Sequence, residues 1–203
     1  MKIVSTVIAS TVLGFALAST ASATTDPVYF KAPLNFAGTG CPANSVAVTG
    51  ENTDTLSILF DSYDAGKDSS SGKRRAACNF AVPVHVPQGY QVSVMSADWQ
   101  GFAEGKTELR RKYFFAGNPN RPWEVSKFND PNGINFLERD QRLHRSLSFS
   151  ECGKDKMIRI NSSIRAKRSN AYIAVDTLDL QNTVKFHLQW RACSPASAPI
   201  PSI

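Results

Sequence analysis

Residues 184–191 read Val-Lys-Phe-His-Leu-Gln-Trp-Arg, so apolar and polar side chains alternate along the whole stretch. Successive side chains of a β-strand point to opposite faces of a sheet. The alternation therefore predicts a strand with one buried face and one face in water. The apolar positions of this strand are Val184, Phe186, Leu188 and Trp190.

The same two-residue period recurs in other parts of the chain. Short strands are predicted at residues 45–49, 56–60, 80–86, 90–99, 107–116 and 158–164. Pro83 lacks a backbone N–H, so its strand must have an edge or a bulge at that position. No long stretch has the 3.6-residue period of an amphipathic helix. Short strands separated by turn signals predict an all-β protein: an antiparallel β-sandwich or jelly-roll-like single domain.

Two segments between these strands have the composition of loops. Residues 61–77 carry no apolar pattern and hold the basic run Lys73-Arg74-Arg75, which predicts a flexible loop and a protease target. Residues 117–142 are polar and contain turn signals such as Asp130-Pro131-Asn132-Gly133. We predict a long excursion from the sheet there, with at most a short strand or helical turn at residues 136–142.

The first 23 residues have the pattern of a secretory signal peptide. Lys2 supplies a positive start, an apolar stretch follows, and Ala21-Ser22-Ala23 offers the small residues after which signal peptidase cleaves. The mature protein is then predicted to be secreted, either extracellular or, in a Gram-negative host, periplasmic. No later segment is apolar enough to span a membrane.

The remainder of the chain is long enough for one domain with a sizeable core. We divide it into a lead-in segment (24–37), a β-sandwich domain (38–193) and a disordered Pro- and Ser-rich tail (194–203). The whole chain has a formal net charge of +6, and removing Lys2 with the signal leaves 6 − 1 = +5. This charge is far below that of a dedicated nucleic-acid binder, so we expect no nucleic-acid partner.

All four cysteines, Cys41, Cys78, Cys152 and Cys193, lie in the predicted mature protein. An even number in an exported chain indicates two disulfides, and no pair has the C-x-x-C spacing of a zinc or redox site. We predict the pairs Cys41–Cys78 and Cys152–Cys193. Loop-closure entropy hardly distinguishes the three connectivities because it grows only logarithmically. The choice depends on strand proximity, since each pair would then join neighbouring strands, the second through a strand at residues 147–150.

The sequence contains no catalytic or cofactor motif of the G-x-S-x-G, H-E-x-x-H, P-loop or dinucleotide-binding types. We therefore expect no catalytic residues, no cofactor and no metal. One enzymatic alternative stays open. A pair of carboxylates such as Asp98 and Glu104 could hydrolyse a polysaccharide, since β-sandwiches host such sites.

Strand parity places several basic side chains on faces exposed to water. No acidic residue lies from Lys156 to Val175, or from Gln181 to Cys193. If these two strands are neighbours, they form one basic face that could bind anions. The alternative is an ordinary solvated face whose charges discourage edge pairing. The basic residues are Arg159, Arg165, Lys167, Lys185, His187 and Arg191.

Two tryptophans complete the set of candidate ligand-binding residues. Trp99 is predicted at a strand end and Trp123 in a loop. Exposed aromatic rings at such places could stack on sugar rings. The alternative is that they cover the core, which is the more common role of large aromatic side chains.

The order of several short segments resembles one known family. With its four cysteines, the chain from about Gly38 to Cys193 is similar to the secreted proteins of domain of unknown function 4360, found in fungi and bacteria. The resemblance implies a small exported β-rich domain with this four-cysteine frame, and it supplies no established activity. The basic run Lys73-Arg74-Arg75 and residues 117–142 depart from the family pattern. The matching segments include Gly38-Thr39-Gly40-Cys41-Pro42, Cys78-Asn79-Phe80, His85-Val86-Pro87-Gln88-Gly89-Tyr90, Trp99-Gln100-Gly101-Phe102-Ala103, Ser150-Glu151-Cys152-Gly153 and Phe186-His187-Leu188-Gln189-Trp190-Arg191-Ala192-Cys193.

These observations favour a secreted, non-catalytic binding module at a cell surface or wall, with a polysaccharide or other anionic polymer as its partner. Two alternatives remain open from sequence. One is a polysaccharide-active enzyme that uses paired carboxylates, and the other is a structural or defensive secreted protein with no small ligand.

Overall fold

The computed structural model describes residues 28–141, 149–175 and 184–194, and within them it contains eleven β-strands and no helix. The all-β prediction is therefore confirmed. The strands are β1 (Tyr29–Phe30), β2 (Asn35–Ala37), β3 (Val46–Thr49), β4 (Thr55–Phe60), β5 (Asp64–Gly66), β6 (Arg75–His85), β7 (Tyr90–Phe115), β8 (Glu124–Asp140), β9 (Lys156–Ala166), β10 (Tyr172–Val175) and β11 (Val184–Ala192).

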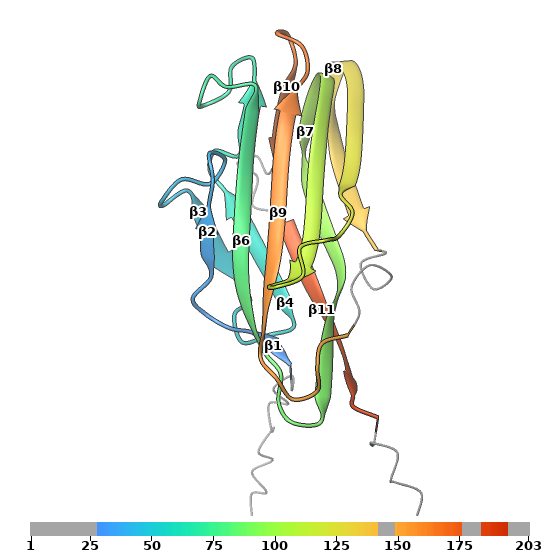
Figure 1. Cartoon of the computed structure of the whole chain (residues 1–203). Helices are drawn as coiled ribbons and strands as arrows, with labels where there is room; N and C mark the ends of the chain where they lie inside the picture. The colour runs from blue at the N-terminus through green and yellow to red at the C-terminus, as the bar shows by residue number, and fades with distance from the viewer. Residues whose placement is uncertain (1–27, 142–148, 176–183, 195–203) are drawn as a thin grey trace, which may run out of the picture.

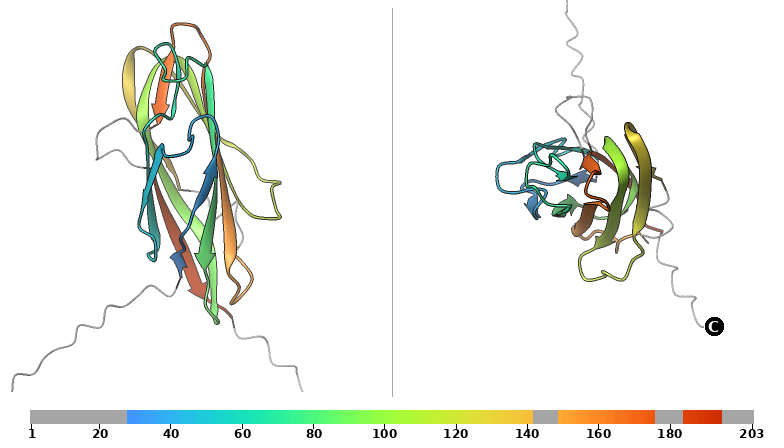
Figure 2. Two further views of the ribbon diagram at one scale, coloured as in Figure 1. Left: turned by 90° about the vertical axis from the view of Figure 1, so that its left-hand side faces the viewer. Right: turned by 90° about the horizontal axis from the view of Figure 1, so that it is seen from above.

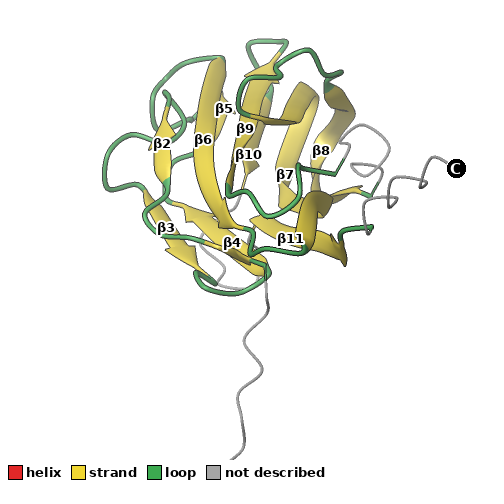
Figure 3. Ribbon diagram, turned by 60° about the horizontal axis from the view of Figure 1, so that its bottom comes forward, coloured by secondary structure: helices red, strands yellow, loops and turns green. Residues whose placement is uncertain are grey.

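The strands form one antiparallel hydrogen-bonded sheet that folds over on itself into two layers (Figure 1). What we call the front layer contains β2, β6, β9, residues 107–115 of β7 and residues 124–130 of β8. The back layer contains β3, β4, β11 and the remaining halves of β7 and β8, with β5 and β10 continuing the lines of β4 and β11. Figure 3 shows the two rows of strands facing each other.

The long strands β7 and β8 belong to both layers because their two-stranded ribbon bends between them. The register shifts between Ala103 and Gly105, and Gly105 and Gly133 have φ angles of 66° and 84°. Such positive φ angles favour glycine, and a Cβ at Gly133 would lie 2.2 Å from the Phe102 ring. A side chain at Gly133 would therefore strain the backbone and force the Phe102 ring to move.

The prediction of a long excursion at residues 117–142 is wrong, since residues 124–140 form β8. The turn signal at Asp130-Pro131-Asn132-Gly133 is real, but it makes the bend instead of ending the strand. The Asn132 N–H donates to Asp130 Oδ1 at 2.9 Å, the local bond expected of an Asx turn. Within residues 61–77, predicted as a loop, the structure has the short strand β5 and the start of β6.

The core lies between the layers, and it uses the apolar faces that the alternation predicted. Ile158, Ile160 and Ile164 of β9 and Val184 and Phe186 of β11 are all buried. Part of the segment predicted as a lead-in also joins the sheet, because β1 and β2 both pair with β6. Pro83, predicted to mark an edge or a bulge, lies inside β6: it pairs with Met157 of β9 on one side, and on the other side it falls between the residues that pair with β2 and those that pair with β1.

Both predicted disulfides are confirmed. Cys41–Cys78 joins the segment before β3 to β6, and Cys152–Cys193 joins the turn before β9 to the end of β11. The first half of the strand predicted at residues 147–150, and the whole signal segment, lie outside the described residues, and residues 149–150 are described but form no strand.

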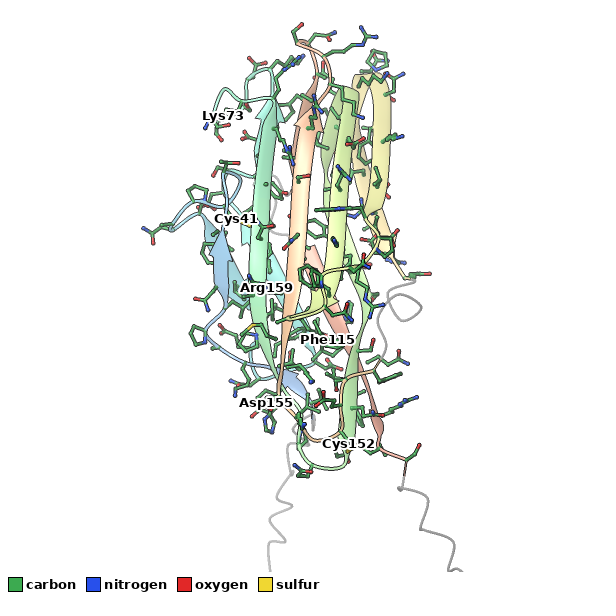
Figure 4. All side chains as sticks on the ribbon, in the orientation of Figure 1. Cys41, Lys73, Phe115, Cys152, Asp155 and Arg159 are labelled. Carbon is green, nitrogen blue, oxygen red and sulfur yellow. A yellow bond between two sulfur atoms is a disulfide. The ribbon has the colours of Figure 1, made fainter. Side chains whose placement is uncertain are left out.

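The two ends of the described chain lie at one end of the sandwich. In Figure 1, β1 and the last residues of β11 are at the bottom. Figure 4 places Cys152 and Asp155 at this lower end and Lys73 near the opposite end.

Candidate functional site

The outward surface of the front layer carries a group of positively charged side chains. In β6, β9 and the second half of β7, alternate residues such as Phe80, Ile160 and Tyr113 face the core, so the residues between them face outward. We call the cationic members of this outward set the basic face. It consists of Arg75, Arg110, Lys112, Arg159 and Arg165.

Strand register arranges these cations across three neighbouring strands. Arg75 of β6 is directly opposite Arg165 of β9. Arg110 and Lys112 of β7 lie opposite Ser163 and Asn161 of β9, which are uncharged. Figure 4 labels Arg159 about half-way along the front layer.

The basic face has almost no compensating negative charge. Among the described residues, none of its five cations forms an ion pair with a carboxylate. In β6, β9 and residues 107–115 of β7, the one acidic residue is Glu108, which faces outward and binds Lys167 at 2.5 Å. The hydrogen bond from Lys167 lowers the pKa of the Glu108 carboxyl, so this residue stays ionised at neutral pH. The surface nevertheless keeps a large excess of positive charge.

Trp123 adds an aromatic ring to this surface. It lies in the segment between β7 and β8, which stands out from the front layer in the left view of Figure 2. Its ring centroid is 4.9 Å from the Arg110 guanidinium carbon and 5.5 Å from Lys112 Nζ, within the range of cation–π contacts. The residue remains 37% exposed, so part of the indole is open to a ligand.

The comparisons with known proteins concern nearly the whole described chain. The family model of Domain of unknown function (DUF4360) matches residues 32–193. The protein belongs to this family. A relative from Arthroderma benhamiae, an uncharacterized secreted protein, is 25% identical over an alignment of 172 positions that covers 79% of this chain and 70% of the relative. The predicted family membership and secretion are thus confirmed.

Two solved structures of carbohydrate-binding proteins also align with this family member. TmCBM61, in complex with β-1,4-galactotriose, aligns with a TM-score of 0.32 and 14% identity over 77% of this chain and 88% of its own. The N-terminal cellulose-binding domain of Cellulomonas fimi β-1,4-glucanase C aligns with a TM-score of 0.20 and 7% identity over 79% of this chain and 90% of its own. The part of the chain that the structure describes has no helix long and apolar enough to cross a membrane.

The structure separates the basic residues that the sequence analysis grouped together. Arg159, Arg165, Lys185 and Arg191 are all exposed, as predicted. The predicted adjacency of their strands is wrong, because β7 lies between β9 and β11 in the hydrogen-bonded order. β9, β10 and β11 pair with successive parts of β7. The sheet folds over between the part of β7 that pairs with β9 and the parts that pair with β10 and β11. The first two arginines therefore lie on the front layer, and the other two residues lie on the back layer.

The predicted basic residues on β11 have a different setting from the front cations. His187 is half-buried, with Nδ1 3.1 Å from Thr55 Oγ1. Arg191 Nε donates to Gln91 Oε1 at 3.2 Å. Lys185 lies opposite the acidic residue Asp98 in the register. These contacts make the outward face of the back layer polar, with less excess charge than the front.

Trp99, predicted as a candidate sugar contact, is instead a core residue. It is fully buried, and its indole N–H donates to the Tyr113 hydroxyl at 2.6 Å. A large aromatic side chain with its one polar group satisfied inside the sandwich has no surface left for a ligand.

The carboxylates considered for an enzymatic site do not share a site. Asp98 pairs with Arg139 at 3.1 Å, whereas Glu104 pairs with Lys67 at 2.6 Å. Six residues of extended strand separate their Cα atoms by roughly 20 Å. No group of three metal-binding side chains is found in the described parts of the chain.

The sequence analysis missed Arg75, Arg110 and Lys112. A signal for the last two was present, since they alternate with Leu109 and Tyr113, which proved to be buried. The charged residue between them, Arg111, hid the alternation because it faces the core.

Proposed function

We propose that the protein is a secreted, non-catalytic binding module that holds an anionic polymer, such as an acidic polysaccharide, against the basic face. The observation that carries this proposal is the set of five outward cations on three adjacent strands, none of which pairs with a carboxylate among the described residues. A protein that used these side chains only for solubility would have no need to collect one sign of charge on one layer.

The dimensions of the basic face suit an extended ligand. Neighbouring strands are about 4.8 Å apart and alternate residues along a strand about 6.7 Å apart. Arg159 and Arg165 therefore span roughly 20 Å along β9, with Arg110 and Lys112 on the next strand. A flat, multiply charged surface of this size gains affinity by contacting several charges of one chain at once. A single small anion would use only part of it.

Charge removal on the two layers tests the proposal. The double variant Arg159→Ser/Arg165→Ser removes two exposed cations from the front layer, and Lys185→Ser/Arg191→Ser removes two from the back layer. Both variants lose the same net charge. We expect retention on immobilised polygalacturonate to fall severalfold for the front variant and to change little for the back variant. Retention of the wild type should also weaken between 50 and 500 mM salt, because exposed charge contacts are screened.

The proposal would be contradicted if the two variants lost retention equally, or if the retention of the wild type did not depend on salt concentration. Product analysis on the same polymer separates the alternatives. New reducing ends or unsaturated sugars would favour a polysaccharide-active enzyme. A protein that neither binds nor cleaves acidic or neutral glycans would favour a structural or defensive role.

A further inference from the structure

A shallow hollow at the upper end of the basic face is lined by positive charge alone. Lys73, Arg74 and Arg75, where the loop after β5 enters β6, face Arg165 of β9 across a space of about 500 Å³. Figure 4 labels Lys73 at this end of the molecule.

The register makes this arrangement electrostatically unfavourable when the hollow is empty. Arg75 and Arg165 are Cα partners in the antiparallel β6–β9 ladder. Like charges placed directly opposite each other destabilise a sheet. On its other side Arg165 lies opposite Glu108, but Lys167 Nζ holds that carboxylate at 2.5 Å. None of the four cations lining the hollow has an ion-pair partner within the described residues.

The backbone that carries these cations is held in place. The Gly66 N–H donates to the Lys73 carbonyl at 2.9 Å, and the Ala166 N–H donates to the Arg74 carbonyl at 3.0 Å. These bonds fix the loop against β5 and β9 on both sides of the hollow. A ligand would therefore meet cations whose backbone is already ordered, which reduces the entropy cost of binding.

We propose that this hollow binds a tetrahedral oxyanion with three terminal oxygens, the phosphate or sulfate group of an ester carried by the polymer. The inference rests on the proposed function and adds a chemical class to it. Three guanidinium groups with planar N–H forks suit an anion that has three or more oxygens. A single carboxylate is planar and has only two oxygens, so it would leave more of these N–H donors unpaired.

Thermal unfolding at constant ionic strength tests the hollow by itself. Phosphate or sulfate should raise the melting temperature of the wild type in a saturating manner, by roughly 5–10 °C at a hundredfold excess over the dissociation constant. Acetate and chloride at the same ionic strength should not. Arg165→Ser should abolish the rise, and in chloride buffer of low ionic strength it should melt no lower than the wild type, because it removes a repulsion. Arg159→Ser, on the same face of β9, is the matched control and should keep the rise.

Polymers then identify the group that is recognised. Arg165→Ser should lose retention on dextran phosphate and dextran sulfate more than on polygalacturonate, and the stronger of the two dextran ligands identifies the ester. The inference would be overturned if acetate raised the melting temperature as much as phosphate or sulfate does. It would also be overturned if Arg159→Ser and Arg165→Ser reduced that rise equally. A specific phosphate or sulfate effect without retention on any polymer would overturn the proposed function and leave the oxyanion site standing.

Discussion

Arg111 of β7 and Asp140 at the end of β8 form a two-point ion pair inside the sandwich, with Nε 2.9 Å from Oδ2 and Nη2 2.6 Å from Oδ1. The pair connects the front-layer half of β7 to the back-layer half of β8. Tyr113 also donates to Oδ2, at 2.6 Å, and Arg111 Nη1 donates to Ser126 Oγ at 2.8 Å. Burial would lower the pKa of Arg111, but the hydrogen bonds and charge of Asp140 raise it, so the guanidinium stays charged.

Breaking this pair on one side should destabilise the protein strongly. Arg111→Leu or Asp140→Leu alone leaves a buried charge without its partner, and each should lower the free energy of unfolding by about 3–5 kcal/mol. The double variant should lose much less than the sum, because it leaves neither charge. Urea unfolding of the three variants measures the coupling. Additive losses would show that the two residues act independently.

The two disulfides should contribute unequally although they close loops of similar size. Their sequence separations are 37 and 41 residues, so the chain-entropy contribution is nearly the same, roughly 4 kcal/mol as an upper bound. Cys41 and Cys78 are buried, whereas Cys152 is exposed. Replacing the first pair by alanine should therefore cost about 1–2 kcal/mol more than replacing the second, because it also leaves cavities. Chemical unfolding of both double variants gives the comparison, and equal losses would mean that packing around the sulfur atoms is unimportant.

Trp123 should contribute to glycan binding, whereas the equally exposed Trp190 should not. Both are 37% exposed, but Trp190 packs edge-on against Tyr90 at the end of β11 and lies away from the basic face. Trp123→Ala should reduce retention on acidic polysaccharide severalfold, while Trp123→Phe keeps a ring and should retain more. Trp190→Ala is the control, and an equal effect of both alanine variants would remove Trp123 from the site.

The ion pair of Glu108 with Lys167 should make stability depend on acid pH. The folded-state pKa of Glu108 is lowered, chiefly by the hydrogen bond from Lys167. The contribution of this ion pair to the stability of the folded protein is therefore fully present above the unfolded-state pKa of about 4.3. It is lost as the pH falls through the lower folded-state pKa. Glu108→Gln should reduce the loss of stability between pH 5 and pH 3 and have no such effect between pH 5 and pH 7. Denaturation curves at these values test it; an unchanged acid slope in the variant would contradict it.

Local sequence patterns predicted the parts of this fold that depend on neighbouring residues. The period of two in β9 and in β11 up to Leu188 correctly identified which side chains face the core, since that choice depends on the pleat of a strand. Trp190, predicted on the same buried face, is 37% exposed at the end of β11. The cysteine pairs were also predictable, because each joins two segments that lie close together in the folded protein.

What the sequence did not reveal depends on contacts between distant segments. Glycine and turn-forming residues occur both at a bend within a strand and at a turn that ends one, so the residues around Gly105 and Gly133 do not distinguish these cases. The pairing of β7 with β8 on both sides of the bend does distinguish them. Trp99 is buried with its N–H satisfied by Tyr113, 14 positions later, a contact that the residues next to Trp99 do not reveal. The separation of Arg165 from Lys185 follows from the folding-over of the sheet, which no single strand encodes.

The position of the two ends has a practical meaning for attachment. Val28 and Ser194 bound the described sandwich beside β1 and the end of β11, at the end away from Lys73 (Figures 1 and 4). A tag, a fused domain or a solid support coupled beyond either of these residues would be attached at the end of the sandwich that is opposite Lys73. The Lys73 end would then point outward, and surface-immobilised protein would display the front layer without the linker crossing it.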